Sequence, residues 1–166
     1  MRPAILEVSQ VRELGEPIYR MIVPDHWADN NGHVNVRWYA VLYDEAGDVL
    51  HDMHALTVES HKVRNSGTMD LQHHTFFVSE IMPGEQLAVY VRALEVNAKR
   101  LHYLMFTVNE AKGQVSNIFE CINTFVDLNV RKTAPWPPEA RQLMEEMIAA
   151  HSICTWPAPL SGAMSV

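Results

Sequence analysis

A long segment of helical periodicity, from Val36 to Met53, constrains the fold more than any other feature of this sequence. Apolar residues recur along it at intervals of three and four, as on a helix with one buried face: Tyr39, Leu42, Tyr43, Ala46, Val49, Leu50 and Met53. Asn35 precedes the segment and is a residue type that caps helix N-termini. Gly47 inside the segment costs about 1 kcal/mol relative to Ala, which indicates close packing or a local break. Such a helix requires an apolar surface to cover its buried face.

Strand-like segments supply that surface. A first strand of about six to ten residues is expected around Ile18–Val23, ending near Pro24. Four more segments are rich in β-forming residues and separated by turn residues, and they are expected at about 70–79, 86–97, 100–109 and 115–129. A terminal helix is expected at about 137–151, followed by a tail to residue 166. This order predicts an α+β fold in one domain spanning residues 1–166.

Composition excludes several classes of protein. The formal net charge of −7, from 20 acidic and 13 basic residues, argues against a protein that neutralises nucleic-acid phosphates. No stretch is apolar enough for a membrane span, and the N-terminal residues lack the apolar core of a signal peptide. Cys121 and Cys154 lie far apart, without a metal-type spacing. We therefore expect a cytoplasmic protein with no nucleic-acid or membrane partner.

The strand at 100–109 carries apolar residues on both faces, because Leu101 and Tyr103 point to one side while Leu104 and Phe106 point to the other. The long helix can cover only one of these faces. We expect a second subunit to cover the other, in a homodimer or homotetramer. The alternative is that the terminal helix suffices.

The loop between the first strand and the long helix holds a candidate catalytic group. Asp29 lies just ahead of the helix N-terminus, where unpaired backbone N–H groups carry partial positive charge. These groups can polarise a carbonyl that the carboxylate attacks, directly or through a water molecule. Gly32 would let the backbone approach a ligand closely. The alternative is an ordinary capping loop without chemistry.

Three segments resemble hotdog-fold acyl-CoA thioesterases of the 4-hydroxybenzoyl-CoA thioesterase type. They are VPDHWADNNGHVNVRWYAVLYDEAGDVL, LQHHTFFVSEIMPGEQLAV and NAKRLHYLMFTVNEAKG. Asp48, the AKRLH segment and the FVD…RKTAPWP tail look most like the thioesterases of carnitine breakdown, which act on betainyl-CoA. The resemblance covers about residues 19–138. It implies a curved antiparallel sheet of about five strands wrapped around a long central helix, with active sites at a dimer interface.

The resemblance also implies roles for individual residues. Asp29 matches the family's nucleophile or general base, and the Val36 backbone N–H matches the donor that polarises the thioester carbonyl. Asn35 matches the Asn of the same motif. Substrate contacts are expected from Gly32, His33, Trp38 and His74. No cofactor is expected, because coenzyme A is part of the substrate. Asn30, Arg37 and Gly47 depart from the commonest residues of the family, which leaves the reaction intact and the substrate shape open.

Basic residues near two turns are candidates for binding the CoA phosphates, although exposed basic turns are common on proteins: Lys99, Arg100, Arg131 and Lys132. A quaternary ammonium substrate would fit an aromatic box, and four residues are available for one or for the core: Trp27, Trp38, Tyr39 and Phe76.

Other catalytic groups have less support. Glu45 lies about 15 Å along the helix from Asn35, so a structural role is favoured. His51 and His54 lack a third ligand at a zinc spacing, and no metal is expected. No nucleophile elbow supports a catalytic serine, and Cys121 lies in an apolar strand. Two other functions stay open: a non-catalytic acyl-CoA or small-ligand binding protein, and a hotdog dehydratase or hydratase, which the loop fits poorly.

Overall fold

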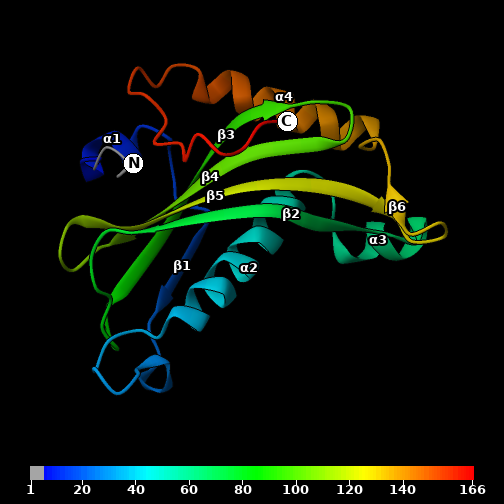
Figure 1. Ribbon diagram of the computed structural model, residues 1–166. Coiled ribbons are helices and arrows are strands. Elements are labelled where there is room, and N and C mark those ends of the chain that lie inside the picture. Colours follow the sequence, from blue (N-terminus) through cyan, green and yellow to red (C-terminus); the bar gives the residue numbers. More distant parts are fainter. Residues whose placement is uncertain (1–5) are drawn as a thin grey trace.

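A curved antiparallel sheet wraps around the long helix α2 in the computed structural model, which describes residues 6–166 (Figure 1). The helices are α1 (Val8–Arg12), α2 (Val36–Met53), α3 (Val58–Arg64) and α4 (Pro138–His151), with a short 3-10 helix at Asp25–Trp27. The strands are β1 (Tyr19–Ile22), β2 (Ser66–Phe77), β3 (Gln86–Val96), β4 (Arg100–Asn109), β5 (Gln114–Asp127) and β6 (Lys132–Thr133). Their spatial order is β1-β3-β4-β5-β2, and β6 pairs with β5.

Helix α2 spans the 18 residues expected from its periodicity, which confirms that prediction. Its side chains and the inward side chains of the sheet, such as Met105 and Phe119, form the larger core cluster. The Asn35 side chain caps the helix by accepting a hydrogen bond from the Arg37 backbone N–H at 3.2 Å. Gly47 neither breaks the helix nor packs closely, since an added Cβ would meet no atom within 4 Å.

The outer face of the sheet is covered within the chain, by α1 and the C-terminal tail rather than by α4. Val11 of α1 and Trp156 of the tail are buried against outward residues such as Phe106. Arg92 fixes the tail by donating to the Trp156 carbonyl at 2.9 Å. Figure 1 shows the tail crossing above the strands while α4 lies along β3. Apolar residues on both faces therefore do not by themselves require a second subunit.

Several elements differ from the prediction. β1 is only four residues long, although the Ile18 and Val23 backbone N–H groups extend its pairing. β2 begins at Ser66, four positions earlier than expected, and the short elements α1, α3 and β6 were not predicted. α3 has no buried residue, so it lacks the periodicity that reveals a helix. The expected strands at 86–97, 100–109 and 115–129 and the terminal helix are confirmed within two residues at each end.

Between Leu6 and Val166, no helix is both long and apolar enough to cross a membrane.

Candidate active site

Asp29 lies in a tight turn between β1 and α2. The backbone N–H of Asp29 donates to the His33 carbonyl at 2.9 Å, and that of Gly32 donates to the Asp29 carbonyl at 3.0 Å. Gly32 adopts a φ of 83°, a backbone conformation that is unfavourable for residues with a side chain. An isolated β-bridge between Ala28 and Val34 closes the base of the turn. The backbone therefore holds Asp29 at a fixed place just before the helix.

The two oxygens of the Asp29 carboxylate have different surroundings. Oδ1 accepts a hydrogen bond from the Asn31 backbone N–H at 2.7 Å. Oδ2 has only long contacts, 3.5 Å to the Asn31 side-chain nitrogen and 3.7 Å to His33 Nδ1. The side chain is 19% exposed. One oxygen thus orients the carboxylate while the other stays available for a ligand.

The first turn of α2 leaves the Val36 amide free. The Arg37 N–H is taken by the Asn35 side chain, and the Trp38 N–H donates to the Asn35 carbonyl at 3.0 Å. The Val36 N–H, which comes before both of them, has no acceptor among residues 6–166. It is the type of helix N-terminal donor that can stabilise developing negative charge on an oxygen.

Asp29 and Val36 line the same cavity, which has a volume of about 400 Å³. Val34, Asn35 and His33 complete its loop side, and Tyr39, Phe77, Ser79 and Glu80 form the rest. The Tyr39 and Phe77 rings meet edge to face with centroids 4.9 Å apart. Burial, and secondarily the Glu80 carboxylate, raise the pKa of Tyr39 to about 12. The expectation that Asp29 and the Val36 amide border one cleft therefore matches the geometry.

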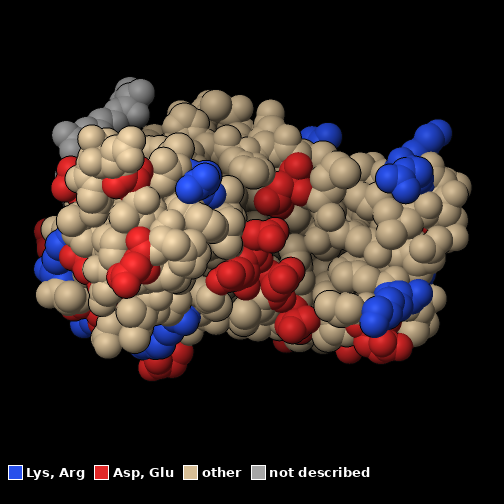
Figure 2. Space-filling model, turned by 90° about the horizontal axis from the view of Figure 1, so that it is seen from below, with Lys and Arg blue, Asp and Glu red and all other residues tan. Residues whose placement is uncertain are grey.

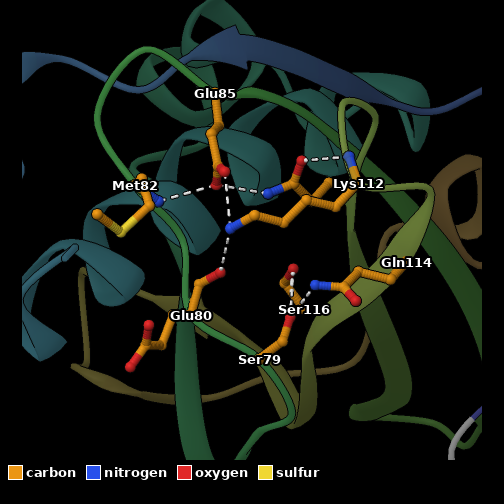
Figure 3. Close-up of polar contacts among 8 residues, drawn as sticks. Ser79, Glu80, Met82, Glu85, Lys112, Gln114 and Ser116 are labelled. Atoms are coloured by element: carbon orange, nitrogen blue, oxygen red, sulfur yellow. Dashed lines mark hydrogen bonds and ion pairs between the residues drawn. The ribbon is translucent and has the colours of Figure 1, made fainter.

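The segment that carries Ser79 and Glu80 is held in place by the hairpin between β4 and β5 (Figure 3). Lys112 Nζ donates to the Glu80 carbonyl at 3.1 Å and pairs with Glu85 at 2.7 Å. The Ser79 hydroxyl donates to the Ser116 hydroxyl at 2.9 Å. Figure 3 shows the Glu80 carboxylate pointing away from Lys112 and Glu85. The wall of the cavity is thus rigid at its backbone, and its acidic side chain is left free.

Two residues predicted to contact the substrate, Trp38 and His74, do not line the cavity. Trp38 stacks on the buried Trp27 with centroids 5.3 Å apart and lies outside the cavity lining. His74 packs its ring on Phe76, 4.4 Å between centroids, on the sheet face opposite α2. Of the four aromatic residues considered for an ammonium box, only Tyr39 lines the cavity, and Phe77 takes the place expected for its neighbour.

The four basic residues considered for CoA lie at the far end of the sheet from Asp29. Lys99 Nζ donates to the Thr133 carbonyl at 3.2 Å, which joins the β3–β4 turn to the segment of Arg131 and Lys132. Arg100 begins β4, and the cavity side lies beyond the other end of that strand. The ten residues of β4 span about 30 Å. The structure therefore brings these residues together with each other and away from Asp29 of the same chain.

The other candidate groups have structural contacts. Glu45 accepts a hydrogen bond from the Tyr19 hydroxyl, which joins α2 to β1. Cys121 is fully buried and, like Cys154, is a free thiol. No group of three or more His, Cys, Asp or Glu side chains in the described part of the chain is arranged to hold a metal ion.

Three lining residues, Phe77, Ser79 and Glu80, were not predicted from the sequence. Phe77 could have been found from strand alternation, because it shares a face with the inward residues of the sheet. Ser79 and Glu80 follow the end of β2, where no periodicity applies.

Comparisons with known proteins agree with this fold. The family model of the thioesterase-like superfamily matches residues 23–144. A betainyl-CoA thioesterase from Pseudomonas aeruginosa is 26% identical over 133 residues, which are 80% of this chain and 84% of that protein. A hypothetical protein from Staphylococcus aureus, solved in complex with CoA, has a TM-score of 0.81 at 17% identity and covers 100% of this chain and 98% of its own. A 1,4-dihydroxy-2-naphthoyl-CoA thioesterase from Synechocystis has a TM-score of 0.66 at 18% identity, over 79% of this chain and 93% of its own. The predicted hotdog fold is thereby confirmed.

Proposed function

Since this chain belongs to the thioesterase-like superfamily, we propose that it hydrolyses a small acyl-CoA to the free acid and CoA, with Asp29 as its key carboxylate. The observation that supports this proposal most is the shared cavity of Asp29 and the unpaired Val36 amide. Thioester hydrolysis itself is the activity of the family.

The geometry suits a direct mechanism. The thioester carbonyl oxygen accepts a hydrogen bond from the Val36 N–H, so the negative charge that develops on it is stabilised. Asp29 Oδ2 then attacks the carbonyl carbon, or takes a proton from a water molecule that attacks it. The carbon–sulfur bond breaks, and CoA leaves as the thiolate and takes up a proton. In the nucleophilic route, water then hydrolyses the anhydride formed with Asp29, which releases the acid and restores the carboxylate. Asn35 keeps the helix start in place through its cap.

The acyl group is proposed from the relatives. The Pseudomonas aeruginosa relative is named a betainyl-CoA thioesterase, and this chain matches most of its length. A cavity of about 400 Å³ has room for a small acyl group of this kind. We therefore propose betainyl-CoA as the first substrate to test.

Substitution of Asp29 tests the catalytic proposal. Asp29→Asn should lower kcat by about 100-fold or more, the contribution expected of a general base or nucleophile. The asparagine can still accept the hydrogen bond from the Asn31 N–H, so the turn and the thermal unfolding midpoint should be retained. Asp25→Asn is the matched control, because Asp25 is exposed on the same loop and does not line the cavity. Wild-type release of CoA thiol by Asp29→Asn would refute the assignment.

A homodimer formed through β2 is also proposed. β2 is the edge of the sheet, and its outer side has no partner strand in residues 6–166. Three of its apolar side chains are exposed: Met69, Leu71 and Phe77. An edge of this kind is a template for pairing with a second copy. Light scattering should give a dimer, or a tetramer if dimers pair again, and Leu71→Lys should shift the mass toward the monomer. A monomeric wild-type protein would contradict the proposal.

Antiparallel pairing of two β2 strands would bring the basic end of one chain toward the cavity of the other. We therefore retain Lys99, Arg100, Arg131 and Lys132 as CoA contacts. Arg131→Ala should raise KM for an acyl-CoA but leave KM unchanged for the same acyl thioester of N-acetylcysteamine, which lacks the phosphates. Equal KM values for wild type and variant with the acyl-CoA would remove Arg131 from the site.

The proposed compartment is the cytoplasm. Both cysteines are buried free thiols, which fits a reducing environment. Cell fractionation would test this, and recovery only outside the cytoplasmic fraction would contradict it.

A further inference from the structure

The cavity carries negative charge. Two carboxylates, those of Asp29 and Glu80, line it, and no Lys or Arg is among its lining residues in the part of the chain described. α2 exposes four acidic residues, Asp44, Glu45, Asp48 and Asp52, against one basic residue, Arg37, which lies over the Trp38 ring outside the cavity lining. Figure 2 shows acidic side chains gathered near the middle of the face seen from below. The site therefore favours a positive group over a neutral or negative one.

Glu80 is placed to act on a ligand rather than on the protein. Its carboxylate makes no hydrogen bond or ion pair with any residue from Leu6 to Val166. Its backbone is fixed, because Lys112 Nζ donates to the Glu80 carbonyl at 3.1 Å. The Lys112 ammonium group forms an ion pair with Glu85 at 2.7 Å and none with the Glu80 carboxylate. The Glu80 carboxylate is therefore free to contact a ligand, and the backbone that carries it is held in place.

Aromatic rings complete the arrangement. Tyr39 and Phe77 line the same cavity as Glu80, and their rings lie edge to face. Glu80 is close enough to the Tyr39 hydroxyl to raise the pKa of that group, so the ring and the carboxylate share one region of the wall. A cation bound there gains from both the carboxylate and the ring faces.

We propose that Glu80 is a specificity-determining residue, which recognises a positive charge on the acyl group beside the Tyr39–Phe77 pair. This inference rests on the proposed thioesterase function and adds the residue that selects the substrate. The chemical class is an acyl group that carries a quaternary or protonated amine. Asp29 performs the reaction, and Glu80 sets the preference among acyl groups.

A pair of isosteric substrates isolates this charge. Betainyl-CoA and 3,3-dimethylbutyryl-CoA differ only in a quaternary nitrogen replaced by carbon, so shape is held constant. The measured quantity is the ratio of kcat/KM for the cationic substrate to that for the neutral one. Glu80→Gln should lower this ratio by about tenfold or more. Glu95→Gln, at the opposite end of β3, and Asp44→Asn, on the acidic face of α2, are the matched controls and should leave the ratio within about twofold of wild type.

A binding measurement keeps the inference separate from catalysis. Calorimetry on Asp29→Asn should give a lower Kd for betainyl-CoA than for the isostere, and the double variant with Glu80→Gln should lose that preference. The inference would be overturned if wild type had equal kcat/KM values for the two substrates. It would also be overturned if Glu80→Gln lowered both kcat/KM values by the same factor. If wild type released no thiol while the Asp29→Asn preference still depended on Glu80, the proposed function would fail and the recognition role would stand. If neither thioester bound, both would fall.

Discussion

Gly47→Ala is expected to stabilise the protein. Gly47 is a buried position inside α2, and a Cβ added there would meet no atom within 4 Å. The helix gains about 1 kcal/mol from the higher propensity of Ala. Burial of the added methyl group contributes up to about 0.8 kcal/mol more. The free energy of unfolding should therefore rise by about 1–2 kcal/mol, which corresponds to an increase in Tm of about 3–6 °C for a chain of this size.

Gly32→Ala is the matched comparison, because the same change is made at a φ of 83°. An L side chain in that left-handed region costs about 1–2 kcal/mol, so the free energy of unfolding should fall. Both variants can be measured by urea denaturation and calorimetric melting. A lower stability of Gly47→Ala would contradict this prediction, since it would mean that α2 packs against the sheet too closely for a methyl group.

Two further predictions concern stability. Burial, and secondarily the nearby His51, lower the pKa of His54 to about 4. In the unfolded chain, His54 takes up a proton near pH 6.5, whereas in the folded chain it stays neutral down to about pH 4. The free energy of unfolding is therefore unaffected by His54 above pH 6.5 and falls by about 3 kcal/mol as the pH drops to 4. His54→Leu should weaken the pH dependence of the urea unfolding midpoint between pH 6.5 and 4. The same pH dependence in the variant and in wild type would contradict this. Trp156→Ala should cost about 3–5 kcal/mol in the free energy of unfolding, because the Trp156 ring is 5% exposed over Phe106 and Arg92. A loss below about 1 kcal/mol would show that the tail is not part of the fold.

The sequence predicted the elements whose burial follows a regular period. α2 was found because its apolar stripe is uninterrupted and Asn35 marks its start. α3 was missed because none of its residues is buried, although Thr57 as its N-cap and Asn65 in the left-handed conformation are end signals of the usual kind. The cover of the outer face was also missed. Trp156 and Arg92 meet through a tail with no repeating pattern, so only the folded chain reveals their contact.

In the candidate site, too, the residues close in sequence could be predicted and those from distant elements could not. Asp29 and Val36 are close in sequence and joined by one turn, so their shared cavity could be predicted from local features and the family resemblance. Phe76 was named where Phe77 lines the cavity, because a shift of one residue along a strand reverses the face that a side chain occupies. Glu80 reaches the site through the hydrogen bond that Lys112 makes from a distant hairpin. Contacts of this kind depend on strand order, which no local pattern encodes.

A crystal structure of the Asp29→Asn variant with an intact acyl-CoA bound would test the proposed active site most directly. We expect the thioester carbonyl oxygen to lie about 3 Å from the Val36 nitrogen, with the carbonyl carbon facing the side chain of residue 29. An ordered thioester bound outside this cavity, or with its carbonyl turned away from the start of α2, would contradict the assignment of the active site.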